Sequence, residues 1–213
     1  MITEKETYEE YSRQHTTPES ELLARLNRET HLKMVYPRML SGQVMGSFLK
    51  MICRMTKPGL VLEIGTFTAY SALYMAEGLP EDAMLHTIEV NPEQEEIISR
   101  YIRESGLEHK ITVHYGKAAD IIPRFGELFD LVFIDANKED YPVYYKMLIG
   151  KMRSGGIILA DNTFWGGKIF DPKNLNDRET RGILEFNEMV QADERVENVM
   201  LPFRDGVMMI RKK

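Results

Sequence analysis

The chain has 213 residues, a net charge of −6 and a single cysteine. This length suits one domain with a continuous core, and 43% hydrophobic with 28% charged residues is an ordinary globular composition that excludes disordered and fibrous classes. The acidic balance disfavours general attraction to a nucleic-acid backbone. No apolar run approaches the roughly 20 residues that span a bilayer, and the first residues lack a signal-peptide pattern. We therefore expect a cytoplasmic protein that does not enter a membrane.

The first quarter of the sequence predicts helices. Thr-Pro-Glu-Ser-Glu at 17–21 is typical of a helix start, and apolar residues follow it at helical spacing. A second helical stripe runs through Val44, Phe48, Leu49 and Ile52. We expect a single domain over 1–213, in which a helical arm (1–57) precedes an α/β core (58–213).

Short apolar runs separated by helical segments follow the arm. Such alternation predicts a parallel sheet, and a turn at Pro202–Gly206 between the last two runs predicts an antiparallel strand near the C-terminus. The polar stretch 166–178 is a candidate mobile loop. The predicted strands are 60–64, 84–90, 111–115, 131–134, 157–160, 196–201 and 207–210.

Two of these strands stop abruptly at an acidic residue. Phe-Ile-Asp-Ala-Asn-Lys occupies 133–138, and Leu-Ala-Asp-Asn occupies 159–162. Ligands of parallel α/β sheets gather at the carboxyl ends of the strands, so we expect Asp135, Asp161 and Asn162 to converge. Two carboxylates and an amide oxygen predict a site for a hard divalent cation.

The first strand ends in Leu-Glu-Ile-Gly, and the second ends at Glu89. A glycine here lets the backbone approach a ligand, and an acidic residue can hold ribose hydroxyls, which favours a nucleoside ligand. The G-x-G-x-x-G pattern is missing after Gly65, so a dinucleotide is disfavoured. The structural alternative is that Gly65 only makes a turn and Glu89 only caps a helix.

The motifs together resemble one enzyme family. Leu-Glu-Ile-Gly-Thr-Phe-Thr-Ala-Tyr-Ser, Thr-Ile-Glu, Phe-Ile-Asp-Ala-Asn-Lys, Ala-Asp-Asn, Trp-Gly-Gly and Asp-Gly occur in order. They resemble the bacterial branch of the cation-dependent class I O-methyltransferases of the caffeoyl-coenzyme A and catechol type. The resemblance implies S-adenosylmethionine (SAM) as methyl donor, a divalent cation, a homodimer, and a doubly wound, mostly parallel seven-stranded sheet with one reversed strand.

The resemblance also assigns roles to residues. Lys138 matches the proposed general base, and Asp135 lies with it at the catalytic centre. Ala69 and Asn137 depart from the family, which commonly has Gly and Asp there. The implied metal ligands are Asp135, Asp161 and Asn162, and the implied donor-binding residues are Met39, Glu63, Gly65, Thr66, Ser71, Glu89, Lys117, Ala118 and Asp135.

The chemistry of methyl transfer restricts the kind of acceptor that we expect. A phenol with a pKa of about 10 is a poor nucleophile at neutral pH, so its hydroxyl must be deprotonated. Mg²⁺, or another divalent cation such as Mn²⁺ or Ca²⁺, would orient two adjacent oxygens and lower their pKa. We therefore expect a small catechol-like or vicinally oxygenated acceptor, with Lys138, its own pKa lowered by the cation, taking the proton.

Other interpretations remain at this stage. Lys138 can instead be a solvated lysine at a helix start, and the five histidines show no spacing typical of metal ligands. A tRNA hydroxyuridine O-methyltransferase would use the same chemistry but needs a basic surface. A nucleotide-binding oxidoreductase is disfavoured by the missing glycine pattern. A non-catalytic SAM-binding protein is suggested by Ala69 and Asn137.

Overall fold

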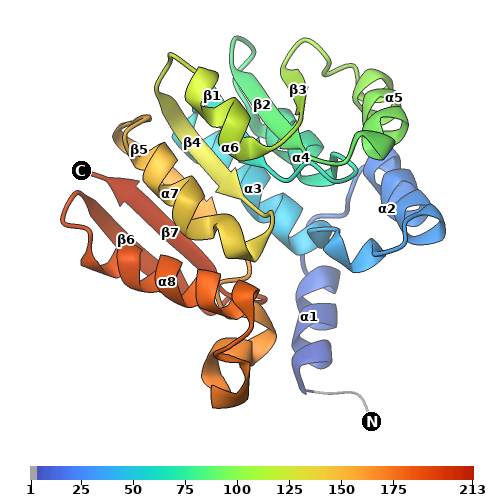
Figure 1. Cartoon of the computed structure of the whole chain (residues 1–213). Helices are drawn as coiled ribbons and strands as arrows, with labels where there is room; N and C mark the ends of the chain where they lie inside the picture. Colours follow the sequence, from blue (N-terminus) through green and yellow to red (C-terminus); the bar gives the residue numbers. More distant parts are fainter. Residues whose placement is uncertain (1–3) are drawn as a thin grey trace. The chain divides into compact units, whose positions relative to one another are not determined.

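The computed structural model describes residues 4–213, with side chains from residue 8 onward (Figure 1). The helices are α1 (Glu4–Gln14), α2 (Glu21–Lys33), α3 (Gly42–Thr56), α4 (Tyr70–Gly78), α5 (Glu95–Ser105), α6 (Ala118–Ile121), α7 (Tyr141–Ile149) and α8 (Arg178–Ala192). The strands are β1 (Leu60–Ile64), β2 (Met84–Glu89), β3 (Ile111–Tyr115), β4 (Phe129–Ile134), β5 (Met152–Ala160), β6 (Val196–Leu201) and β7 (Val207–Lys212).

The strands form one seven-stranded sheet in the order β3-β2-β1-β4-β5-β7-β6. β4 pairs in parallel with β1 and with β5, whereas β7 runs antiparallel to both β5 and β6. The predicted α/β sheet with a reversed strand near the C-terminus is therefore confirmed.

The residues group into two compact units. The first contains 4–59, 66–85 and 91–113, and the second contains 60–65, 86–90 and 114–213. Segments from the middle of the sequence thus group with the N-terminal helices. The predicted single domain, with its arm (1–57) and core (58–213), stays a prediction. No helix among residues 4–213 is long and apolar enough to cross a membrane.

In the first unit, α2 begins where the sequence predicts. The Ser20 hydroxyl accepts a hydrogen bond from the Leu23 N–H and caps the helix. α2 is then tied to α5 through the Glu29 carboxylate, which lies 2.6 Å from Arg100 Nη2 and accepts a hydrogen bond from the Tyr101 hydroxyl over 2.7 Å. This polar contact joins segments 71 residues apart in the sequence.

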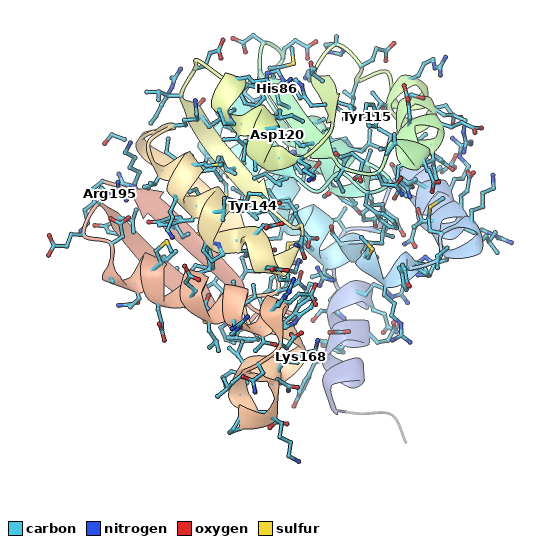
Figure 2. All side chains as sticks on the ribbon, viewed as in Figure 1. His86, Tyr115, Asp120, Tyr144, Lys168 and Arg195 are labelled. Atoms are coloured by element: carbon cyan, nitrogen blue, oxygen red, sulfur yellow. The ribbon has the colours of Figure 1, made fainter. Side chains whose placement is uncertain are left out.

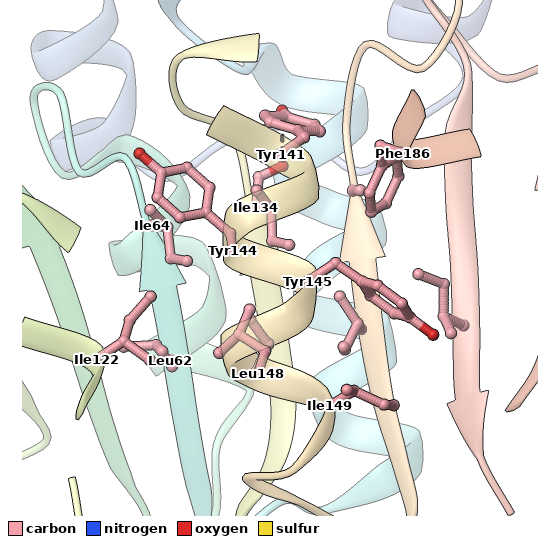
Figure 3. Packing of buried hydrophobic residues seen from close by; sticks show 14 of the residues in the cluster. Leu62, Ile64, Ile122, Ile134, Tyr141, Tyr144, Tyr145, Leu148, Ile149 and Phe186 are labelled. Atoms are coloured by element: carbon pink, nitrogen blue, oxygen red, sulfur yellow. Dashed lines mark hydrogen bonds between the residues drawn. The ribbon is translucent and has the colours of Figure 1, made fainter. Parts of the chain in front are cut away.

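In the second unit, α7 packs along the face of β1, β4 and β5 (Figure 3). Its buried residues recur at helical spacing, and each fully buried large side chain contributes about 1.5–3 kcal/mol relative to an exposed one. α8 adds Phe186, whose ring lies edge-on to the rings of Tyr141 and Tyr145. This packing holds the carboxyl ends of β4 and β5 in place. The buried α7 residues are Tyr141, Pro142, Tyr144, Tyr145, Leu148 and Ile149.

Stretch 166–178 contains more local structure than a polar loop suggests. Two 3₁₀ turns within Trp165–Phe170 meet at a kink where Gly166 and Gly167 have positive φ, and a further 3₁₀ turn spans Pro172–Asn174, which the Asp171 side chain caps. Its mobility stays a prediction.

Candidate active site

Asp135 and Asp161 lie at the ends of two neighbouring strands. Ile134 of β4 pairs with Ala160 of β5, so the next residue of each strand is an aspartate. The Asp161 N–H donates to the Ile134 carbonyl over 3.0 Å, and the Tyr141 hydroxyl lies 3.2 and 3.1 Å from the Ile134 and Asp161 carbonyl oxygens. Because neighbouring strands lie about 4.8 Å apart, the two carboxylates are brought together as predicted.

Gly65 is required by packing at the same strand ends. Its φ is +105°, and a Cβ at this position would lie 2.0 Å from the Asp135 carbonyl oxygen. The Asp135 N–H in turn donates to the Ile64 carbonyl over 2.9 Å. The structural alternative for Gly65 therefore has direct support, and its contact with a donor stays a prediction.

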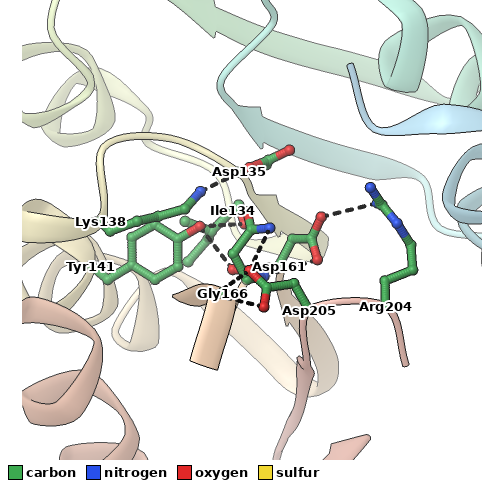
Figure 4. Close-up of polar contacts among 9 residues, drawn as sticks. Ile134, Asp135, Lys138, Tyr141, Asp161, Gly166, Arg204 and Asp205 are labelled. Atoms are coloured by element: carbon green, nitrogen blue, oxygen red, sulfur yellow. Dashed lines mark hydrogen bonds and ion pairs between the residues drawn. The ribbon is translucent and has the colours of Figure 1, made fainter. Parts of the chain in front are cut away.

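Asp161 is a buried carboxylate, only 2% exposed. Its Oδ1 accepts a hydrogen bond from the Asn162 N–H over 2.8 Å, and its Oδ2 lies 3.3 Å from Arg204 Nη1 (Figure 4). Burial and then the negative charge of Asp135 raise the pKa of Asp161 to about 6, although Arg204 acts in the opposite direction. This carboxylate favours a partner with more positive charge than Arg204 alone supplies.

Lys138 is also buried, at 5% exposure, in a 3₁₀ turn that follows β4 (Lys138–Asp140). Its Nζ donates to Asp135 Oδ1 over 2.9 Å and lies over the rings of Tyr141 and Trp165, at 5.1 and 5.7 Å from their centroids. Lys138 is therefore not a solvated surface lysine. Burial alone would lower the pKa of Lys138, but the charge of Asp135 and the contact with Tyr141 raise it. The neighbours within the chain thus act against the lowered pKa expected from a cation.

Asn162 and the turn between β6 and β7 complete this cluster. Asn162 has a left-handed backbone, with φ of 60°, and its Nδ2 lies 3.4 Å from Asp205 Oδ2. Asp205 also accepts hydrogen bonds from the Gly166 N–H at 2.7 and 2.9 Å. Gly206 packs so closely that a Cβ would lie 2.8 Å from the Thr163 hydroxyl and the Phe164 ring.

Arg204, Asp205 and Tyr141 have no role predicted from the sequence. Asp205 belongs to a motif that carried the family resemblance, so its position was marked without a function. Arg204 and Asp161 are 43 residues apart in the sequence, and no local sequence pattern predicts their contact.

The residues assigned to the donor fall in both compact units. Met39, Thr66 and Ser71 belong to the first unit. In the second unit, Glu89 ends β2 at 7% exposure, Lys117 precedes α6, and Ala118 begins it. Glu63 has no exposed surface and accepts a hydrogen bond from the Thr87 hydroxyl over 2.5 Å. Their roles toward SAM stay predictions.

Two histidines of neighbouring strands form a pair. His86 Nδ1 of β2 lies 3.0 Å from His114 Nε2 of β3, and both rings pack against Phe125 (His86 is labelled in Figure 2). Burial lowers the pKa of both imidazoles. The two imidazoles therefore take part in local packing.

The donor set at the strand ends suits a hard cation. Within residues 4–213 no group of three or more His, Cys, Asp and Glu side chains is arranged to hold a metal ion. The set predicted here contains two carboxylates, and its third oxygen is the amide of Asn162. A buried, incompletely neutralised Asp161 beside Asp135 fits a divalent cation on charge grounds.

Comparison with known proteins decides the family. The model of the O-methyltransferase family matches residues 10–213. The chain belongs to the O-methyltransferase family. As the resemblance implied, it is a SAM-dependent O-methyltransferase that transfers a methyl group to a hydroxyl.

Individual relatives of this O-methyltransferase cover nearly the same length. Caffeoyl-CoA O-methyltransferase 2 of Populus trichocarpa is 34% identical over 196 residues, which cover 87% of this chain and 79% of the relative. The SAH-bound methyltransferase PaMTH1 of Podospora anserina superposes with a TM-score of 0.91 at 28% identity, covering 100% of this chain and 98% of the other. The O-methyltransferase TomG of Streptomyces achromogenes, in complex with SAM, gives 0.89 at 29% identity, covering 100% of both chains.

Proposed function

We propose that this O-methyltransferase methylates one hydroxyl of a vicinal pair on a small catechol-like acceptor, with the help of a divalent cation. The observation that carries the proposal is the buried Asp161 carboxylate, which lies beside Asp135 and whose pKa is raised to about 6 by burial and by that neighbour. The similarity to caffeoyl-CoA O-methyltransferases, whose names specify a caffeoyl acceptor, supports it.

Asp135, Asp161 and Asn162 would hold the cation, which would supply a Lewis acid that orients two adjacent oxygens and lowers the pKa of a hydroxyl. The acceptor oxygen forms a bond to the methyl carbon of SAM as the carbon–sulfur bond breaks. The sulfonium thereby becomes a neutral thioether, and the hydroxyl proton must leave.

We infer that Lys138 Nζ would accept that proton when it is neutral. As an ammonium held by Asp135, its Nζ would stabilise an ionised acceptor oxygen nearby. It would serve as general base to the extent that the charge of Asp135 is taken up by another partner, because that charge raises the pKa of Lys138. Nζ also lies over the rings of Tyr141 and Trp165, and these contacts would help to hold it in position.

A transfer assay tests this proposal. The protein is stripped with a chelator and incubated with methyl-labelled SAM and, separately, catechol, a flavonoid, caffeoyl-CoA and undermodified tRNA, before and after addition of Mg²⁺, Mn²⁺ or Ca²⁺. We expect cation-dependent labelling of the vicinal diols. If only tRNA is labelled, the acceptor is a tRNA nucleotide and not a small vicinal diol. A homodimer in the cytoplasm is part of the same proposal, and light scattering checks the oligomeric state.

A further inference from the structure

Arg204 is the basic residue that contacts Asp161. It lies in the turn between β6 and β7, and its guanidinium reaches the end of β5 (Figure 4). Its φ is +54°, in the left-handed region that costs a non-glycine residue about 1–2 kcal/mol. An arginine at a position that favours glycine suggests that its side chain serves a function.

Most N–H donors of the Arg204 guanidinium have no acceptor among the described side chains. Among residues 8–213, whose side chains the structure describes, the only acceptor that Arg204 contacts is Asp161 Oδ2, at 3.3 Å. The neighbouring Asp205 already accepts hydrogen bonds from the Gly166 N–H. A guanidinium carries five N–H donors in a planar fork that matches a carboxylate. Its side chain is 28% exposed, so a ligand can reach the remaining donors.

A cation and Arg204 would compete for Asp161. Oδ1 accepts the hydrogen bond from the Asn162 N–H, and Oδ2 is the oxygen that Arg204 contacts. A divalent cation that takes Asp161 as a ligand either uses Oδ2 or lies beside the guanidinium. Two positive groups on one buried carboxylate repel each other, so cation binding drives Arg204 away from Asp161.

The charge balance then favours an anionic acceptor. Lys138 and Arg204 balance Asp135 and Asp161. A dication and the sulfonium of SAM add three positive charges, of which an ionised acceptor hydroxyl and Asp205 offset two. A further negative charge on the acceptor would meet the free donors of Arg204.

We propose that Arg204 selects the acceptor: it is displaced from Asp161 by the cation and then binds a carboxylate carried by the vicinal diol. This inference rests on the proposed function, since it needs the cation at Asp161. It predicts that carboxylated catechols are preferred to catechol itself.

The test uses three variants of the full chain and two readouts. Arg204→Gly removes the charge and suits the positive φ, whereas Arg204→Lys keeps the charge but loses the fork. Arg211→Gln removes an exposed arginine that pairs with Glu197 and is the matched control. Mn²⁺ affinity is measured by calorimetry without donor or acceptor, and kcat/KM is measured for 3,4-dihydroxybenzoate and for catechol.

We expect Arg204→Gly to bind Mn²⁺ at least about tenfold more tightly, because one unit charge near the ion is removed. The ratio of kcat/KM for 3,4-dihydroxybenzoate over catechol should fall at least about tenfold, the effect of losing one charge-assisted hydrogen bond. Arg204→Lys should keep the wild-type Mn²⁺ affinity and lose part of the preference, and Arg211→Gln should change neither.

Two results separate this inference from the proposed function. If wild-type transfer depends on a cation but Arg204→Gly keeps the wild-type Mn²⁺ affinity or the wild-type acceptor ratio, the role of Arg204 is wrong and the proposed function stands. If wild-type transfer is unaffected by the chelator, both are wrong.

Discussion

The Nζ of Lys138 lies 2.9 Å from Oδ1 of Asp135, and both side chains are largely buried. The family resemblance makes one of them the general base and the other a metal ligand. Their contact means that the two roles are coupled, because anything that takes up the charge of Asp135 also changes the proton affinity of Lys138.

The Lys138→Met variant tests whether Lys138 is the general base. We expect turnover to fall by about 10²-fold to 10⁴-fold, the usual range for general-base catalysis. The mutant rate should recover partly as the pH rises and more acceptor ionises without help. Mn²⁺ affinity should not fall, since Asp135 loses a competing cation. Rates from pH 6 to 9 check this, with Lys146→Met as the control, because Lys146 is an exposed lysine that pairs with Glu185. Wild-type turnover in Lys138→Met throughout this range would remove the base assignment.

Asp161 should make stability depend on pH. Its pKa is raised from 3.8 to about 6, so between these values the folded state binds more protons than the unfolded state. In chelator, the stabilisation contributed by Asp161 should be greatest below pH 4 and fall by roughly 1–3 kcal/mol as the pH rises from about 4 through about 6. Urea unfolding between pH 4 and 7.5 measures this fall. Asp161→Asn should flatten the profile, and an equally steep profile in that variant would assign the effect to another group.

The contribution of Glu29 to stability should depend on pH in the opposite direction to that of Asp161. Hydrogen bonds from Arg100, Lys33 and Tyr101 lower the pKa of Glu29 from 4.5 to about 2, so its contribution is present above pH 4.5 and is lost as the pH falls toward 2. We expect Glu29→Gln to cost about 1 kcal/mol at pH 7 and less at pH 3. Urea midpoints at the two pH values check this against Glu108→Gln, an exposed control. Equal losses at both pH values would contradict the prediction.

Gly65 should tolerate no side chain. In Gly65→Ala the new Cβ would meet the Asp135 carbonyl at 2.0 Å, so we expect a loss above about 3 kcal/mol and weaker Mn²⁺ binding. Gly42→Ala is the matched control, because Gly42 also has a positive φ but no atom within 4 Å of its added Cβ. It should cost only about 1 kcal/mol. Similar losses in the two variants would mean that backbone conformation, and not the contact with Asp135, decides the cost.

Sequence patterns predicted the bounds of three strands as the structure has them. The ranges 60–64, 111–115 and 196–201 agree with the structure. β5 begins earlier than predicted, at Met152, because the four residues after Met152 are Arg, Ser, Gly and Gly and lack the apolar signal. Asp135 and Asp161 could be placed together because parallel strands share one carboxyl edge. The approach of Arg204 to Asp161 depends on how a turn folds back, and no periodicity encodes that.

The structure shows what surrounds the two departures from the family, Ala69 and Asn137. It has φ of 68° at the start of α4, in the left-handed region where glycine is the easier residue. Asn137 donates to Asp140 over 2.9 Å, so the amide has a structural partner that an aspartate would repel. Asn137 thus has a local structural role, and neither departure removes a proposed metal ligand.

The proposed mechanism requires a cation, held by Asp135, Asp161 and Asn162, to activate the acceptor. The most direct measurement is methyl transfer from labelled SAM to 3,4-dihydroxybenzoate in excess chelator, followed by titration with Mg²⁺, for the wild type, Asp161→Asn and the exposed control Asp82→Asn. We predict no transfer in chelator, full recovery with Mg²⁺ in the wild type and the control, and no recovery in Asp161→Asn. Full wild-type turnover in chelator would show that no cation is needed for the transfer.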